Sequence, residues 1–182
     1  MHLPIRLHAV AAAAILLSAS PAQASNKDWA TASDVGVVAL TALAIGLPAV
    51  HGDSRGAIQS AGSEAAAGLV VSGLKQIFPE RRPDGSDNNS FPSGHTAVSF
   101  AAAASIFRRE GASIGIPAFA AASFVGVARV EADKHHWYDC VVGAGIGTAA
   151  GLLLTHTQDS RHALVVPWGD THGGGVSMAM AF

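Results

Sequence analysis

Apolar residues in the middle of the chain fall into five runs separated by short polar or glycine-containing joints. The runs cover about Asp34–Val50, Asp53–Phe78, Thr96–Arg108, Ala112–Ala128 and Asp139–Thr155. Hydrophobic positions within them recur with helical spacing, and none of the five runs alternates with the period of two that is typical of strands. The pattern therefore predicts an all-α core, a helical bundle of about five helices.

Local signals support the helix starts and one packing face. Asp34 and Asp53 precede apolar runs and are suited to cap the first turn of a helix, and Ser93 or Thr96 can do so for the third run. In the last run a glycine recurs at every fourth position, at residues 143, 147 and 151. This spacing places the glycines on one helix face and predicts a close approach to a neighbouring helix.

The two ends of the chain differ from the middle. Arg6 is followed by the short apolar run Ala9–Leu17 and by small residues ending at Ala24, which is typical of a cleaved secretory signal peptide. We therefore expect a signal peptide over residues 1–24, a linker over 25–33, a helical domain over 34–157 and a tail over 158–182. Alternation within the tail around a glycine-rich centre predicts a short C-terminal β-hairpin.

Composition narrows the functional classes. The 182 residues are 49% hydrophobic and 13% charged, and the net charge is −2, so no broad basic face is available for nucleic acid. The lone Cys140 excludes an intramolecular disulfide. The uninterrupted apolar stretches within these runs are shorter than the roughly 20 residues that usually span a bilayer. Arg108 and Arg109 lie at one end of the bundle, as expected for a cytoplasmic end. We favour a membrane-embedded bundle, and a soluble periplasmic domain remains the alternative.

Three polar clusters carry residues that a helical bundle does not need for packing. They are Lys75-x6-Arg82-Pro83, Pro92-Ser93-Gly94-His95 and Arg129-x5-His135-x3-Asp139. In an up-and-down bundle, the end of the second helix and the start of the third lie at the same end as the junction of the fourth and fifth helices. The three clusters are therefore expected to meet at one end of the molecule.

These residue types suit the transfer of a phosphoryl group. Lys75, Arg82 and Arg129 supply three cations that can neutralise phosphate oxygens. Backbone N–H groups of Ser93 and Gly94 at a helix start can face the same anion. His135 and Asp139 are four residues apart, so the carboxylate can orient the imidazole and leave its other nitrogen to attack phosphorus. His95 can protonate the leaving oxygen. No cluster with metal-ligand spacing is present in the sequence, so metal-free chemistry is expected.

The three clusters together resemble the signature of the type 2 phosphatidic acid phosphatase superfamily, which also includes bacterial acid phosphatases and vanadium haloperoxidases. Its pattern is Lys-x6-Arg-Pro, Pro-Ser-Gly-His and Ser-Arg-x5-His-x3-Asp, and the chain departs from it only at Ala128, which stands in place of the first serine of the third motif. Ala128 thus lacks a hydroxyl that would help to hold the phosphate.

The resemblance implies roles for each matching residue. His135 would form a phosphohistidine, Asp139 would orient it and His95 would act as the acid. The phosphate-binding residues would be Lys75, Arg82, Ser93, Gly94 and Arg129, with no metal and no cofactor. The resemblance thus implies a phosphatase acting on a phosphomonoester or pyrophosphate.

A lipid-linked substrate and an inner-membrane location with the site facing the periplasm are expected. A vanadate-dependent haloperoxidase and a non-catalytic envelope protein that retains the bundle remain alternatives. The sequence does not indicate an oligomeric state.

Overall fold

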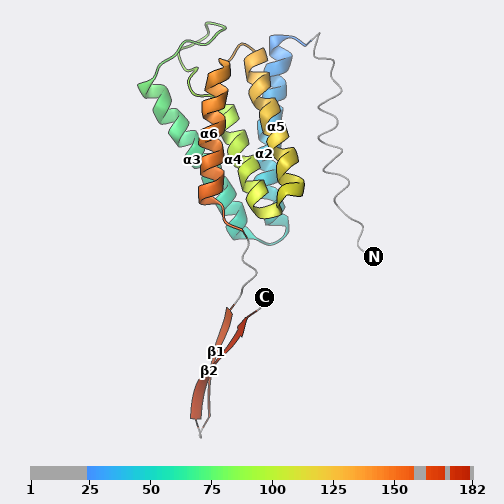
Figure 1. Cartoon of the computed structure of the whole chain (residues 1–182), viewed down its shortest axis with the longest axis vertical. Coiled ribbons are helices and arrows are strands. Elements are labelled where there is room, and N and C mark those ends of the chain that lie inside the picture. The colour runs from blue at the N-terminus through green and yellow to red at the C-terminus, as the bar shows by residue number, and fades with distance from the viewer. Residues whose placement is uncertain (1–23, 158–162, 171–172, 181–182) are drawn as a thin grey trace, which may run out of the picture.

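Five helices form the core of the protein. The computed structural model describes residues 24–157, 163–170 and 173–180, with side chains in the first of these ranges. The helices are α2 (Asn26–Val50), α3 (Ser54–Ile77), α4 (Gly94–Glu110), α5 (Ala112–Glu131) and α6 (Trp137–Leu154). They run up and down with α4 in the middle of the bundle (Figure 1). The predicted all-α core is confirmed, while residues 1–23 of the predicted signal peptide lie outside the described residues.

The first helix begins earlier than the sequence pattern predicted. Residues 25–33 were expected to form a linker, but α2 starts at Asn26 and includes nearly all of them. The reason is a capping box. The Ser25 side chain accepts a hydrogen bond from the Asp28 N–H, and the Asp28 carboxylate accepts one from the Ser25 N–H. Asp34 therefore lies inside the helix rather than at its cap, whereas Asp53 caps α3 as predicted.

Small side chains allow α4 to occupy the centre of the bundle. Residues 101–106 of this helix are all buried, and four of them are alanine. Because these side chains are short, α2, α3, α5 and α6 can all pack against α4. On one side Ala97 and Ala101 meet Ala67 and Val71 of α3. The core is thus thin and rich in alanine, which explains how a low aromatic content is compatible with a closed bundle.

The glycine face of α6 packs against α4, as predicted. A Cβ atom added at Gly147 would collide with the backbone carbonyl of Ala97, and one added at Gly143 would lie 2.6 Å from the carbonyl oxygen of Ser93. Since neither backbone can move away without separating the helices, only glycine fits at these positions. This close contact fixes α6, which carries Asp139, against α4, which follows Ser93.

Two strands follow the bundle. Strand β1 (Ala163–Asp170) pairs antiparallel with β2 (Gly173–Met180) in a separate two-stranded sheet. The register places Ala163 opposite Met180 and Asp170 opposite Gly173.

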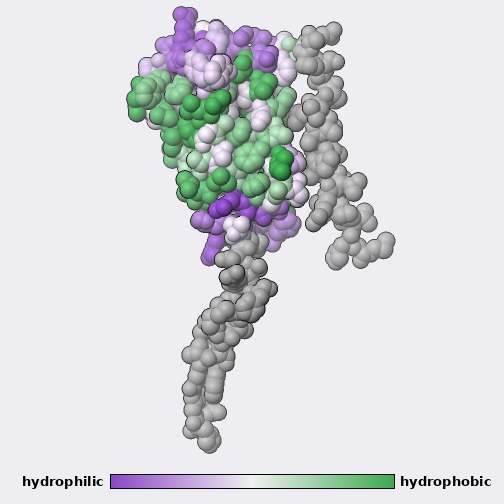
Figure 2. All heavy atoms as spheres, in the orientation of Figure 1, coloured by the Kyte–Doolittle hydropathy of each residue, from purple (hydrophilic) through white to green (hydrophobic). Residues whose placement is uncertain are grey.

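The bundle exposes a broad apolar surface. Figure 2 shows a hydrophobic band around the middle of the visible face, with hydrophilic residues at both ends. Helices α2, α5 and α6 are long and apolar enough to cross a membrane. Exposed apolar side chains on the helices include Val38, Leu69 and Ile116, with exposed fractions of 67%, 74% and 62%. Such a surface is typical of proteins that contact lipid.

Arg108 and Arg109 lie in the last turn of α4, and Arg109 is not a free positive charge. The Arg109 side chain is only 6% exposed and forms an ion pair with Asp53, the cap of α3. Its guanidinium also donates to Gln59 and to the backbone of His156. Arg109 therefore stabilises the packing of this end, and the net positive charge there is smaller than a count of arginines indicates.

Candidate active site

The three sequence clusters meet at the end of the bundle where α3 and α5 end and α4 and α6 begin. The N–H of Ser93 donates to the backbone oxygen of Asp139 over 3.1 Å, which joins the second cluster to the third. The guanidinium of Arg82 donates to the backbone oxygen of Lys134 over 3.4 Å, which joins the first cluster to the third. The convergence expected from an up-and-down topology is therefore present.

His135 and Asp139 form the buried centre of this end. Both side chains are buried, with exposed fractions of 2% and 0%, and Nδ1 of His135 lies 3.4 Å from Oδ2 of Asp139. Although this nitrogen is close to the carboxylate, it has no aligned hydrogen-bond partner among residues 24–157. Because Nδ1 faces the carboxylate, Nε2 is the ring nitrogen left for a substrate.

His135 lies just outside α6, so it does not share a helical turn with Asp139, although the four-residue spacing predicted that it would. His136 is the N-cap of α6 and has extended backbone, so the helix begins at Trp137. The Asp139 carboxylate accepts the His136 N–H over 2.9 Å and also accepts the hydroxyl of Ser90. These two bonds hold the carboxylate in place beside His135. The pair thus forms through a helix cap rather than along a helix face.

Two of the predicted phosphate-binding cations hold the loop between α3 and α4. The Lys75 ammonium donates to the backbone oxygens of Asn89 and Ser90. Arg82 forms an ion pair with Asp87 at 2.7 Å and donates to the third cluster as described above. These contacts fix the loop while they keep both cations near His135.

Arg129 is a buried cation with unused hydrogen-bonding capacity. It is 6% exposed, and its Nη1 lies 3.3 Å from the Ser33 hydroxyl and 3.6 Å from Oδ1 of Asp34. Its Nε has no hydrogen-bond partner among the described side chains and backbone. A buried guanidinium N–H without a partner is costly unless a ligand accepts from it. The geometry therefore suits an anion next to Arg129.

The electrostatic environment favours neutral His135. Burial lowers the pKa of this imidazole well below its ordinary value, and the positive charges of Arg129, Arg82 and Lys75 lower it further. Asp139 opposes the shift without cancelling it. A neutral imidazole is the nucleophilic form, so the same cations that suit phosphate also keep His135 unprotonated.

The backbone amide of Ser93 does not face an anion site, although the sequence predicted that it would. Ser93 is the N-cap of α4 and is fully buried; its hydroxyl contacts Thr96, while its N–H donates to Asp139. The Ser93 amide is therefore already engaged by the fold. Gly94 and His95 are the first residues of α4, where backbone N–H groups have no intrahelical partner and can serve an anion.

His95 has a partner that sequence reasoning missed. Nε2 of His95 lies 2.8 Å from Oδ1 of Asp34, and this carboxylate is also the one beside Arg129. The apolar pattern predicts a helix start at Asp34, whereas α2 begins at Asn26 and Asp34 lies inside it. The Ser25-x-x-Asp28 spacing is a capping-box signal that predicts a helix start at residue 26. With that start, Asp34 falls inside α2 instead of at its cap.

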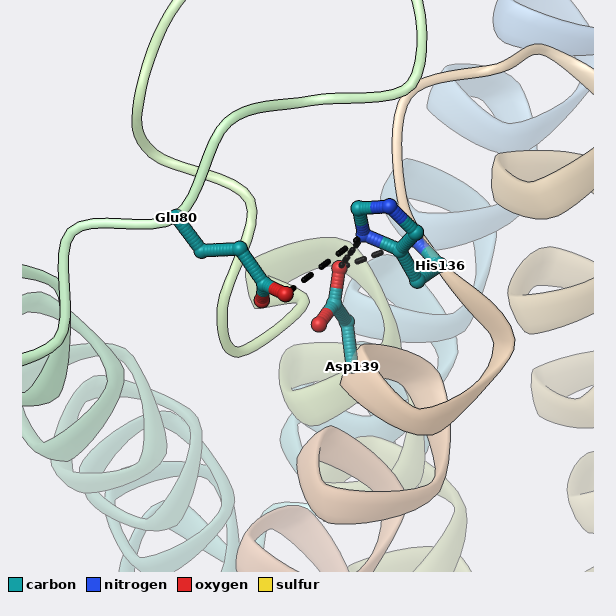
Figure 3. Close-up of side chains that lie close together, drawn as sticks. All are labelled: Glu80, His136 and Asp139. Carbon is teal, nitrogen blue, oxygen red and sulfur yellow. Dashed lines mark hydrogen bonds and ion pairs between the residues drawn. The ribbon is translucent and has the colours of Figure 1, made fainter.

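A second group of side chains surrounds Asp139 on its other side. Figure 3 shows Glu80 and His136 approaching the Asp139 carboxylate from the α3–α4 loop and the start of α6. Nδ1 of His136 lies 3.9 Å from Oε1 of Glu80 and 3.6 Å from Oδ2 of Asp139. The Tyr138 hydroxyl donates to Glu80. No spacing rule links residue 80 to residues 136 and 139, so this cluster arises only in the folded chain.

The missing serine of the third motif leaves a methyl side chain at a fully buried position, Ala128. The nearby Arg129 nevertheless contacts a serine hydroxyl, that of Ser33 on α2. Ser33 therefore supplies a hydroxyl to this guanidinium from a different helix.

Comparison with known proteins gives three findings. A model of the PAP2 superfamily matches residues 56–163 of the chain. The lipid A 1-phosphatase of Porphyromonas gingivalis is 38% identical over 93 residues, which are 49% of this chain and 21% of that protein. The chain thus matches about a fifth of the length of that relative. The crystal structure of Aquifex aeolicus LpxE has a TM-score of 0.62 at 21% identity, over 79% of this chain and 92% of the other, which shows a shared fold.

Proposed function

The chain belongs to the PAP2 superfamily, and we propose that it is a metal-independent phosphatase that removes a phosphate from a membrane lipid through a phosphohistidine intermediate. The observation that carries the proposal is the buried His135–Asp139 pair beside Arg129, whose Nε has no partner among residues 24–157. A nucleophile, its orienting carboxylate and an unsatisfied cation thus lie at one end of the bundle.

The proposed reaction begins when the phosphate binds between Lys75, Arg82 and Arg129. Nε2 of His135 attacks phosphorus, and the bond between phosphorus and the leaving oxygen breaks while His95 donates a proton to that oxygen. Asp139 stabilises the imidazolium that forms. Water then attacks the phosphohistidine, His95 takes up its proton, and free phosphate and neutral His135 are restored. The three cations neutralise the phosphoryl oxygens in both steps.

A groove beside this site supports a lipid as the rest of the substrate. It is an open, shallow hollow of about 730 Å³, lined by the end of α3, the loop after it, Phe91 and Tyr138. Ile77 and Phe78 in its lining are 67% and 53% exposed. Because Tyr138 directly precedes Asp139, an acyl chain can lie in this groove while its phosphate reaches His135. A pyrophosphate-linked lipid would fit the same arrangement.

The apolar surface supports a location in a membrane. The apolar band and three membrane-capable helices support a bundle embedded in a bacterial membrane, with the hydrophilic end that holds His135 at an aqueous face. We propose the inner membrane with that end toward the periplasm, and a soluble periplasmic domain is the alternative.

The test is phosphate release by the purified full chain in detergent. We expect hydrolysis of p-nitrophenyl phosphate and of a panel that includes phosphatidate, lipid A and undecaprenyl pyrophosphate, with no loss of activity in EDTA. His135→Ala should abolish release. His51→Ala, at the exposed end of α2, is the matched control and should retain it. Equal release by the wild type and His135→Ala would disprove the proposal.

A further inference from the structure

The cluster in Figure 3 has a chemistry that the proposed reaction does not use. We propose that Glu80, His136 and Asp139 form an inhibitory site for a divalent transition-metal ion such as Zn²⁺. The effect on rate rests on the proposed phosphatase function, whereas the binding of the ion does not. The site would make a metal-independent enzyme sensitive to metal at its aqueous end.

The ligand atoms are already close to a metal-binding arrangement. One nitrogen and two carboxylate oxygens lie within 4.8 Å of one another, at 3.9 Å between His136 and Glu80 and 3.6 Å between His136 and Asp139. Ligand atoms around a tetrahedral zinc ion are about 3.3 to 3.6 Å apart, given bonds of about 2.0 to 2.2 Å. The His136–Asp139 spacing is already in this range and the His136–Glu80 spacing is close to it, so a movement of the Glu80 carboxylate by up to about 1 Å toward the other two ligands would close the site.

The donor set fits zinc better than magnesium or calcium. An imidazole nitrogen is a favourable ligand for zinc, copper and nickel, while magnesium and calcium prefer sites made of oxygen alone. The two carboxylates supply two negative charges that offset those of the ion. The Asp139 oxygen next to His136 is Oδ2, which also accepts from Ser90 and from the His136 N–H, whereas the buried Oδ1 has no hydrogen-bond partner within residues 24–157, so the carboxylate keeps one free acceptor for an ion.

The fold holds these ligands in place. The Glu80 N–H donates to Asn88 and its backbone oxygen accepts from Ser90, at 3.0 and 2.9 Å. The Tyr138 hydroxyl fixes the Glu80 carboxylate, and the Tyr138 ring stacks on the His136 ring at 5.1 Å. Glu80 and His136 are partly exposed, with side-chain fractions of 31% and 34%, so an ion can reach them from solvent.

Inhibition follows because Asp139 is shared. Its Oδ2 lies 3.4 Å from His135 and 3.6 Å from His136, so an ion bound to this oxygen removes charge from the partner of the nucleophile. The imidazolium formed during attack would then lose its stabilising carboxylate. The Lys75 ammonium is close enough to Asp139 for the two charges to attract each other, and the same positive charge repels a bound cation. We therefore expect reversible inhibition rather than a permanently occupied structural site.

The experiment measures binding and rate separately on the full chain in detergent. Co²⁺ binding is followed by its visible absorption, and Zn²⁺ affinity by calorimetry, with the wild type and with His135→Ala, which removes the nucleophile but none of the three ligands. Inhibition of p-nitrophenyl phosphate hydrolysis by Zn²⁺ is measured in parallel. The test variant is Glu80→Gln, which keeps the size of the side chain. The control is Glu131→Gln, an exposed glutamate outside the cluster.

We expect Zn²⁺ to inhibit the wild type and Glu131→Gln equally and EDTA to reverse it. In Glu80→Gln the zinc concentration for half-inhibition should rise by more than about tenfold, and the Co²⁺ absorption should weaken. Zinc affinities that are equal in Glu80→Gln and the wild type, or the absence of binding to the wild type, would overturn the proposal. If neither the wild type nor any variant hydrolyses p-nitrophenyl phosphate, the proposed function fails. The Co²⁺ and Zn²⁺ binding measurements would still show whether the metal site exists.

Discussion

Nδ1 of His135 lies 3.4 Å from Oδ2 of Asp139, and that same oxygen accepts hydrogen bonds from Ser90 and from the backbone of His136. One carboxylate oxygen therefore both ties the start of α6 to the α3–α4 loop and faces the proposed nucleophile. A change at Asp139 should thus affect catalysis more strongly than a change at either of its other partners.

Asp139→Asn tests this relationship. The amide keeps the shape of the side chain but cannot stabilise an imidazolium, so we expect kcat for p-nitrophenyl phosphate to fall by about a thousandfold. Because His135→Ala should already abolish release, the measurement is kcat of Asp139→Asn against that of the wild type. Equal kcat values for the two would contradict the proposed role of Asp139.

The pKa of His135 sets the acid side of the pH profile. Burial and the charges of Arg129, Arg82 and Lys75 lower this pKa, so the imidazole stays neutral and nucleophilic as the pH falls below about 6.5. The acid limb of kcat/KM should therefore lie well below that value. Removal of one cation in Arg82→Gln should raise the pKa and move the limb to higher pH.

The control for this profile is Arg55→Gln, an exposed arginine in the first turn of α3. It should leave the acid limb where it is in the wild type. One substrate is used throughout, so that the ionisation of its phosphate cancels in the comparison. A limb that stays in place in Arg82→Gln would contradict the proposed origin of the shift.

Topology explains why much of the site was predictable. The alternation of helix direction places the end of α3 and the start of α4 at the same end as the α5–α6 junction, whatever the crossing angles. The clusters around Arg82, His95 and His135 therefore had to converge. The glycines of α6 were equally informative, since their spacing predicted a close contact, which Gly147 makes with α4.

The remaining features depend on loop and cap geometry, which no periodic pattern encodes. Ser93 was expected to offer its amide to phosphate, but that N–H donates to Asp139. Glu80 lies near His136 and Asp139 because the α3–α4 loop folds back on itself through backbone hydrogen bonds of Glu80 with Asn88 and Ser90. Asp34 was missed for a simpler reason, which is that the start of α2 was placed too late.

Asp34 should act as a positioning residue for His95. The two side chains lie 2.8 Å apart, so Asp34→Asn removes the charge that orients and supports the protonated imidazole. We expect kcat for an alkyl phosphate to fall by about tenfold to a hundredfold, since an alkoxide needs a proton to leave. With p-nitrophenyl phosphate the loss should be small, because nitrophenolate leaves as a stable anion. Equal losses with both substrates would indicate a structural role instead.

Helix packing gives a prediction about stability. Gly147→Ala places a methyl group against the Ala97 backbone of α4, and we expect a loss of about 1 to 3 kcal/mol in the free energy of unfolding. Gly145 lies two residues away on α6 with open space around its added Cβ, so Gly145→Ala should be neutral or stabilising by up to about 1 kcal/mol. Thermal unfolding in detergent measures both. Equal melting temperatures for the two variants would refute the packing argument.

The groove beside the site predicts a separation between lipid and soluble substrates. Phe78 lines it and is 53% exposed, so Phe78→Ala removes apolar surface that an acyl chain would cover. Burial of a phenylalanine side chain contributes about 1.5 to 3 kcal/mol, and because Phe78 is already half-buried we expect kcat/KM for a long-chain lipid phosphate to fall by about tenfold. The value for p-nitrophenyl phosphate, which has no acyl chain, should be unchanged. Ile116→Ala, an exposed apolar position on α5 outside the groove, should change neither value. A loss shared by both substrates in Phe78→Ala would place the acyl chain elsewhere.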